Sequence, residues 1–193
     1  MSAFNPSEAV TFDLAFGHLH LDGAPSRVMV PADALLKLCL AAGADQAADL
    51  ASAVGEALGR RVAVRMAAGN DDRAAAVRAA GLEAVVEQLA GELALVGMGA
   101  LSAERWGRAL ILIVDQSPFG DAGDDFMAEV LQAGLHGLTG ATESRVLRLH
   151  REGVRARFVV VSGKAVAAVR ARIERGDNWG SVIAALHPGG AEA

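Results

Sequence analysis

Hydrophobic residues in the second half of the chain fall into strand-length patterns. An apolar run occupies residues 108–114, and Asp115-Gln-Ser-Pro-Phe119 ends it with residues that favour turns. Ser144 to Leu149 and Arg155 to Val161 alternate apolar and polar side chains, as paired strands do. We therefore expect one strand before the segment 120–139 and two paired strands after it.

Two further stretches predict hairpins. Ala100 to Arg105 reads as a strand that Trp106-Gly107 joins by a turn to the apolar run after it. Near the N-terminus, Val10 to Leu21 alternates at period two over its second half, the turn Asp22-Gly-Ala-Pro25 follows, and Arg27-Val-Met-Val30 resumes the apolar pattern. This order predicts a hairpin between the two apolar stretches.

Apolar residues at spacings of three and four predict helices between these strands. Pro31 opens a first helix, which Gly43 ends. A second helix runs from about Asp45 to Leu58, with Gly59 as its stop. Arg60 to Met66 stays ambiguous, because Val62 and Val64 alternate with Ala63 and Arg65 and a short strand is an alternative.

A third helix extends from about Ala74 to Val96 and falters at Gly81. A fourth, Phe126 to Thr139, contains regularly spaced glycines, and we expect the last aspartates of the preceding loop, Gly120 to Asp125, to cap it. Two more helices are predicted at the C-terminal end, and their ranges are 163–175, after Ser162, and 179–186, after Asp177 or Asn178.

The strands thus come in adjacent pairs, in the order β-β-α-α-α-β-β-α-β-β-α-α. Pairs joined by short turns are antiparallel, so the predicted fold class is α+β, an antiparallel sheet flanked by helices. We expect residues 1–162 to form this domain and residues 163–193 to form a C-terminal helical extension.

Composition narrows the classes of protein to consider. The chain has 193 residues, 52% of them hydrophobic and 4% aromatic, with no Tyr, so a globular core must consist mainly of Ala, Val and Leu. The formal net charge is −5, and neither a basic stripe nor interleaved aromatic residues indicate a nucleic-acid partner.

The same sequence gives an expectation about location. Cys39 is the one cysteine, which excludes an internal disulfide and favours a reducing compartment. Met1 to Pro6 lacks the pattern of a signal peptide, and no apolar run approaches the ~20 residues of a membrane span. We expect a soluble, cytoplasmic protein.

Residues that could perform catalysis or bind metal are scarce. His18 and His20 share one face of a strand and could bind a metal with a third ligand, although alternate polar residues are also what a solvent-facing strand shows. Ser117 lacks the Gly-x-Ser-x-Gly turn of a nucleophile, and Cys39 lies on the apolar side of its helix. We predict no catalytic residue, no metal site and no cofactor, and we favour binding over catalysis.

The glycines of one helix and the two tryptophans indicate where parts of the chain, a ligand or a second copy come into close contact. Gly134, Gly137 and Gly140 lie along one helix, where each glycine costs about 1 kcal/mol relative to Ala. Close approach of another backbone or of a ligand would offset that cost, so these glycines are predicted interface positions. Trp106 is expected at the hairpin end, and Trp179 is predicted to dock the last helix onto its own domain or onto a neighbouring copy.

The order of several stretches resembles the 4-vinyl reductase domain, also called a hydrocarbon-binding domain, whose fold small subunits of TRAPP vesicle-tethering complexes share. The resemblance covers roughly residues 10–162. The stretches are Arg27-Val-Met-Val-Pro-Ala-Asp-Ala-Leu35, Gly97-Met-Gly-Ala-Leu101, Ser117-Pro-Phe119, Gly134-Leu-His-Gly-Leu-Thr-Gly140, Arg145-Val-Leu-Arg-Leu149 and Gly153-Val-Arg-Ala-Arg-Phe-Val-Val160.

The chain departs from that family at its cysteines. Typical members carry cysteines near the start of the glycine-spaced helix and within the final two strands, and in some regulators these cysteines hold zinc. At those places this chain has Phe126, Arg or His around Leu149, and Ala156-Arg157. The usual tetrahedral zinc site is therefore not available, and vinyl reduction is not transferred on resemblance. A weaker likeness, over Ala80 to Leu138, is to the D component of cellulose synthase, which is a scaffold.

Two hypotheses follow from the resemblance and the residues together. The first is a non-catalytic, dimeric module that binds an apolar small molecule between sheet and helices and acts in regulation or assembly, with a possible protein partner. The alternative is a scaffold that forms homo-oligomers through the glycine-spaced helix or the C-terminal helices, without a ligand. The predicted ligand-binding wall consists of Met98, Trp106, Phe119, Phe126, Met127 and His136.

Overall fold

The computed structural model describes residues 9–21, 28–67, 72–107 and 109–186. Among them, strands and helices follow one another in the predicted order. The elements are β1 (Val10–Asp13), β2 (His18–Leu21), α2 (Ala32–Ala42), α3 (Ala44–Ala67), α4 (Arg73–Leu95), β3 (Ala100–Trp106), β4 (Ala109–Asp115), the 3-10 turn η1 (Asp121–Gly123), α5 (Asp124–Thr139), β5 (Ser144–Glu152), β6 (Arg155–Ser162), η2 (Gly163–Ala165), α6 (Val166–Glu174) and α7 (Trp179–Ala184).

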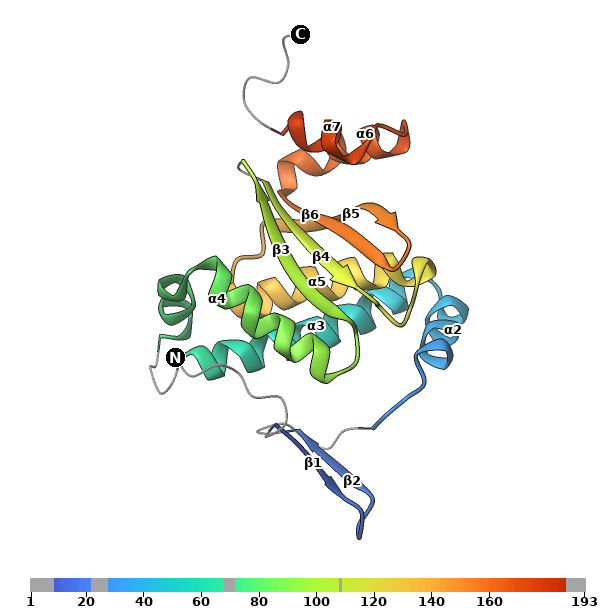
Figure 1. Ribbon diagram of the computed structural model, residues 1–193, viewed down its shortest axis with the longest axis vertical. Coiled ribbons are helices and arrows are strands. Elements are labelled where there is room, and N and C mark those ends of the chain that lie inside the picture. Colours follow the sequence, from blue (N-terminus) through green and yellow to red (C-terminus); the bar gives the residue numbers. More distant parts are fainter. Residues whose placement is uncertain (1–8, 22–27, 68–71, 108, 187–193) are drawn as a thin grey trace.

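The main sheet is four-stranded and antiparallel, with the strand order β3-β4-β6-β5. The predicted fold class, an antiparallel sheet flanked by helices, is confirmed. Helices α3, α4 and α5 lie on one side of this sheet, and α6 and α7 lie on the other (Figure 1). Strand β4 is buried on both faces: Leu112 and Val114 pack toward α3–α5, and Ile111 and Ile113 pack toward α6–α7. This double burial explains why residues 109–114 read as a continuous apolar run.

Helix α3 corrects the predicted stop at Gly59. The helix continues to Ala67, so the stretch Arg60 to Met66 is helical and not a strand. A Cβ atom on Gly55 would lie 2.2 Å from the carbonyl oxygen of Val130, and one on Gly59 would lie 2.1 Å from that of Gly134. These glycines therefore let α3 approach α5 closely, and neither ends the helix.

The N-terminal hairpin closes earlier than predicted. Both of its strands lie within residues 10–21, and Asp13 Oδ1 accepts hydrogen bonds from the amides of Ala15 and Phe16 at 3.1 and 3.2 Å. Gly17 follows with a φ of 67°. The turn predicted at 22–25 and Arg27 lie outside the described residues, and residues 28–30 form no strand. Figure 1 shows the hairpin standing away from the sheet and its helices.

Helix termini agree with the sequence expectations only in part. The break in α4 at Gly81 is confirmed, with a φ of 78° and a ψ of 161°. The cap at Asn178 is confirmed too, since its side chain accepts a hydrogen bond from Ser181 N at 2.9 Å. The predicted aspartate cap of α5 is wrong: Gly123 is the N-cap residue and provides no side-chain bond, while Asp124 is buried in ion pairs.

Candidate ligand-binding site

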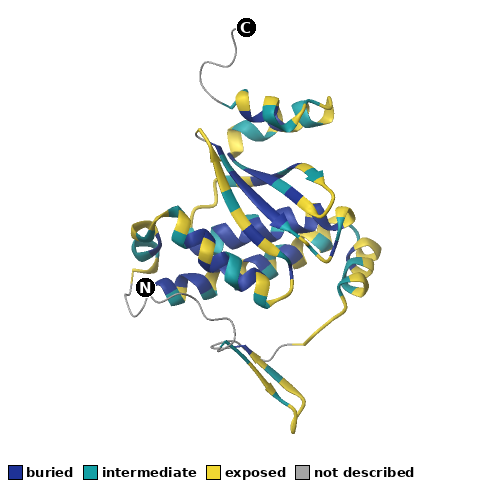
Figure 2. Ribbon diagram, in the orientation of Figure 1, coloured by how far each residue is buried: buried dark blue, intermediate teal, exposed yellow. Residues whose placement is uncertain are grey.

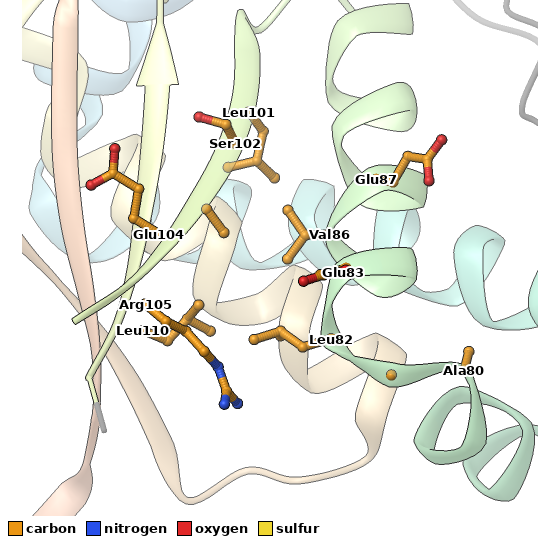
Figure 3. Close-up of a pocket in the computed structure, with 12 residues that line it drawn as sticks. Ala80, Leu82, Glu83, Val86, Glu87, Leu101, Ser102, Glu104, Arg105 and Leu110 are labelled. Carbon is orange, nitrogen blue, oxygen red and sulfur yellow. The ribbon is translucent and has the colours of Figure 1, made fainter. Parts of the chain in front are cut away.

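A groove of about 660 Å³ separates α4 from β3 (Figure 3). Two features of the fold create this groove. Strand β3 is an edge strand that pairs with β4 on one side, so its other side is open toward α4. The break at Gly81 interrupts α4 beside this strand, and the residues 80–83 at the break line one end of the groove. We name this feature the α4–β3 groove.

The walls of the α4–β3 groove are mainly apolar. Leu82 and Val86 point from α4 toward β3 (Figure 3), and Val86 and Leu101 are buried. Alternate residues of a strand share a face, so Leu101, Ala103 and Arg105 belong to the same side of β3. Leu110 of β4 completes the apolar lining.

Two side chains of opposite charge lie among these apolar residues. Figure 3 shows Glu83 on α4 and Arg105 on β3, with the Arg105 guanidinium at one end of the groove. Among the described residues, the ion pairs do not include Arg105. Glu104 also borders the groove, but it accepts a hydrogen bond from Trp106 Nε1 at 3.0 Å. Glu87 and Ser102 line the groove as well, so its lining combines apolar side chains with one guanidinium and three carboxylates.

None of the six predicted wall residues lines this groove. Met98, Phe119, Phe126 and Met127 are buried in the core on the α3–α5 side of the sheet. Among them the rings of Phe119 and Phe126 lie 5.4 Å apart. Leu35, Leu36 and Cys39 of α2 lie beside these two rings, and the space among the five side chains is too small to hold a water molecule.

The other two predicted wall residues have different surroundings. The Nε2 atom of His136 lies 2.8 Å from the carbonyl oxygen of Ser144, which ties α5 to the start of β5. Trp106 is half-exposed, and its ring centroid lies 5.0 Å from that of Trp179. The structure therefore brings Phe119 and Phe126 together and places Trp106 against the C-terminal helices.

Sequence reasoning missed the residues that do line the groove. In the sequence, Leu82 and Val86 belong to the apolar stripe of a helix, and Leu101 and Arg105 belong to a strand. The signals available were the break at Gly81 and the alternation along β3. These two signals do not reveal that β3 is the edge strand or that α4 lies beside it. Both facts depend on the order of the strands in the sheet, which the sequence does not give.

Gly134, Gly137 and Trp179 contact other parts of the same chain, whereas a Cβ atom on Gly140 would have no neighbour within 4 Å. A Cβ atom on Gly134 would lie 3.5 Å from Gly55 O, and one on Gly137 would lie 3.0 Å from Glu56 O, so both face α3. Gly140 is the C-cap residue of α5, with a φ of 72°. The Arg157 guanidinium lies 5.2 Å from the centroid of the Trp179 ring. Trp179 thus docks its helix onto its own domain.

Acidic side chains elsewhere form structural ion pairs. Asp124, at the start of α5, is buried and binds Arg148 at 3.1 Å and also Arg151, whose guanidinium pKa it raises. Asp115 accepts hydrogen bonds from Arg155 at 2.8 and 3.1 Å, and these bonds hold the pKa of its carboxyl below the ordinary value. Within the described ranges, no three His, Cys, Asp or Glu side chains are grouped as a metal site would need.

Comparison with known proteins gives a likeness in fold. No protein-family profile matches the chain, and no curated protein matches it. Its fold is similar to the crystal structure of the phenol-responsive sensory domain of the transcription activator PoxR with phenol. The TM-score is 0.60 at 16% sequence identity, over 85% of this chain and 92% of that one. In the part of the chain that the structure describes, no helix is long and apolar enough to cross a membrane.

Proposed function

We propose that this protein is a non-catalytic binding module that holds an apolar small molecule with one polar group in the α4–β3 groove and acts in regulation. The observation that carries the proposal is the groove itself. Its volume of about 660 Å³ lies inside the range of roughly 300–1,000 Å³ that is usual for small-molecule sites. Polar groups among apolar side chains are also usual for such sites, because the polar groups orient the ligand.

The likeness to a sensory domain supports the same class of ligand. That domain is phenol-responsive, and phenol is an apolar ring with one hydroxyl group. Arg105 could donate a hydrogen bond to such a hydroxyl, and Glu83 could accept one from it. The resemblance to hydrocarbon-binding domains points in the same direction. Phenol is accordingly the first probe, and the natural ligand would be of similar chemistry.

Helix α4 offers a path from the groove to the rest of the domain. Val86 faces the groove, while Glu92, two turns further along α4, is fully buried and accepts a hydrogen bond from Arg61 of α3 at 2.9 Å. A ligand that binds one position of α4 better than another would shift the population toward that position. The buried pair would then transmit the change to α3.

Phenol binding measured by calorimetry tests this proposal. Replacing Arg105 with Ala removes the hydrogen-bond donor and should weaken binding roughly 10- to 150-fold, since a hydrogen bond to a charged group contributes roughly 1.5–3 kcal/mol. Ala103→Trp should abolish binding by filling the groove, because Ala103 lines it and is only half-buried. Val64→Trp is the matched control, because Val64 lies on α3, is exposed and does not line the groove. Equal phenol affinity in all of these variants would refute the proposed site.

A scaffold function without a ligand is the second candidate. The observation that favours it is the set of exposed apolar side chains on the N-terminal hairpin. Native mass spectrometry after gentle purification separates the two candidates. A retained small molecule would support the binding module, and an oligomer of fixed stoichiometry that carries no small molecule would support the scaffold.

A further inference from the structure

Strand β3 has an open hydrogen-bonding edge along the α4–β3 groove. It is a terminal strand of the main sheet, and its residues Ala100–Trp106 pair with β4 in unbroken register. In an antiparallel pair, the backbone N–H and C=O groups of alternate residues point away from the partner strand. Within the described ranges, no backbone hydrogen bond from another element reaches these groups on β3. Figure 2 shows β3 as largely exposed beside the buried strand β4. Such an edge is a template for a further strand.

The opposite edge of the main sheet carries features that usually prevent such pairing. Strand β5 has a β-bulge between Arg148 and His150, and charged residues are spread along its length. Bulges and charged side chains are common means by which proteins protect an edge strand. Strand β3 instead pairs regularly over all seven of its residues, and residues 100–103 are uncharged. The β3 edge is therefore the better suited of the two to accept a strand.

The groove beside this edge supplies apolar contacts for one face of an added strand. Leu82 and Val86, one turn apart on α4, point toward β3 (Figure 3). Leu101 and Ala103 share one side of β3 and line the same groove. Apolar side chains at alternate positions of an extended segment would contact these residues, because side chains on one face of neighbouring strands lie side by side. In strand addition, main-chain hydrogen bonds give affinity and pockets for alternate side chains give specificity.

The charges around the groove favour a basic partner. Among the described lining residues, the carboxylates of Glu83, Glu87 and Glu104 outnumber the single guanidinium of Arg105. All three glutamates are exposed, two of them on α4 at the rim of the groove and one on β3. Opposite charges on adjacent strands stabilise their pairing, and like charges destabilise it. The formal net charge of the whole chain, −5, also attracts basic segments.

We infer that the β3 edge binds an extended peptide in which apolar residues alternate with basic residues. The peptide adds a further strand to the main sheet, its apolar side chains enter the α4–β3 groove, and its basic side chains lie near Glu83, Glu87 and Glu104. The inference goes beyond the proposed function and rests on the sheet edge, so it stands whether or not the groove holds phenol. A small molecule in the groove would take the space of the apolar side chains, so the two occupants would exclude each other.

Fluorescence anisotropy with the full chain tests the inference. The probe is a labelled peptide in which lysine and valine alternate, and the ionic strength is ~0.15 M, which screens long-range attraction. We expect saturable binding of one peptide per chain. A peptide in which glutamate replaces lysine should bind about tenfold more weakly or worse, because its charges would repel the three carboxylates.

Charge reversal on α4 locates the binding site. The variant with Glu83→Lys and Glu87→Lys should bind the lysine peptide about tenfold more weakly and the glutamate peptide more tightly than the unaltered protein does. Both residues are exposed, so the circular dichroism spectrum should stay the same. The variant with Asp49→Lys and Glu174→Lys is the matched control, because these exposed residues do not line the groove and the change in net charge is equal. This control should bind the lysine peptide as the unaltered protein does.

Amide hydrogen exchange provides a readout that attraction by charge alone would not change. The bound lysine peptide should slow exchange at alternate amides of residues 101–105, which are the amides that point away from β4. The inference fails if the lysine peptide does not bind, if the α4 variant and its control bind it equally, or if the bound peptide leaves exchange on β3 unchanged. It also fails if protection of β3 in the free protein rises with protein concentration, because a second copy would then occupy the edge.

Discussion

Glycines on α3 and α5 meet at one crossing but differ in how much space each has. A Cβ atom on Gly59 would lie 2.1 Å from Gly134 O, whereas one on Gly134 would have its nearest neighbour at 3.5 Å. We expect Gly59→Ala to lower the free energy of unfolding by about 2 kcal/mol, because overpacking costs roughly 1–3 kcal/mol and exceeds the gain in helix propensity. Urea denaturation of each variant measures the effect.

Gly134→Ala is the matched control at the same crossing. Its Cβ would make an ordinary van der Waals contact, so the helix propensity of Ala should leave stability unchanged or raise it by up to about 1 kcal/mol. Equal destabilisation by the two substitutions would contradict the geometry of the crossing.

These residues also show what the sequence could and could not predict. The spacing of Gly134, Gly137 and Gly140 predicted a closely approaching backbone. Helix α3 provides it at Gly134 and Gly137, whereas Gly140 ends α5 and a Cβ atom there would have no neighbour within 4 Å. The prediction that Gly59 ends its helix was wrong, since a glycine that ends a helix and one that packs inside a helix look the same in one sequence. The difference depends on which face of α3 meets α5, which is a tertiary property.

At the scale of elements, a buried ion pair fastens α5 to the sheet. Asp124 is buried at the start of α5 and binds Arg148 and Arg151 of β5. Asp124→Asn would leave a largely buried Arg151 without its charged partner, and we expect a loss of about 3 kcal/mol in the free energy of unfolding. Thermal and urea denaturation at neutral pH measure this loss.

Asp121 gives the comparison for this prediction. It also pairs with Arg148, but its side chain is 71% exposed. Exposed ion pairs contribute about 0–1 kcal/mol, so Asp121→Asn should have a small effect. If Asp121→Asn lowered the free energy of unfolding as much as Asp124→Asn, the burial of an ion pair would not determine its contribution to stability.

The order of strands and helices along the chain was predicted better than which of them lie side by side in the fold. Apolar periodicity and turn residues indicated the order of strands and helices, and the strand pairs β3–β4 and β5–β6 follow from short turns. The sequence did not indicate that β6 would lie between β4 and β5. This order leaves β3 at the edge beside α4, so the α4–β3 groove could not be predicted without it.

At the scale of the whole molecule, the C-terminal helices close a second core. The outer face of the sheet presents Ile111, Ile113 and Val159, and these side chains are buried together with Val182 and Ile183 of α7. The division into residues 1–162 and 163–193 stays a prediction. The shared core indicates that the two parts fold together, because a bare outer face would expose a contiguous apolar surface.

A point substitution and a truncation test whether the main domain depends on α6 and α7 for its stability. Ile183→Ala should lower the free energy of unfolding by about 3 kcal/mol, which is typical of truncating a buried Ile. Ending the chain after Ser162 should give an aggregating or unfolded product. Arg170→Ala on the exposed side of α6 is the control and should change stability by less than about 0.5 kcal/mol. A soluble, cooperatively folding 1–162 fragment would instead show that α6 and α7 are an appendage to an independent domain.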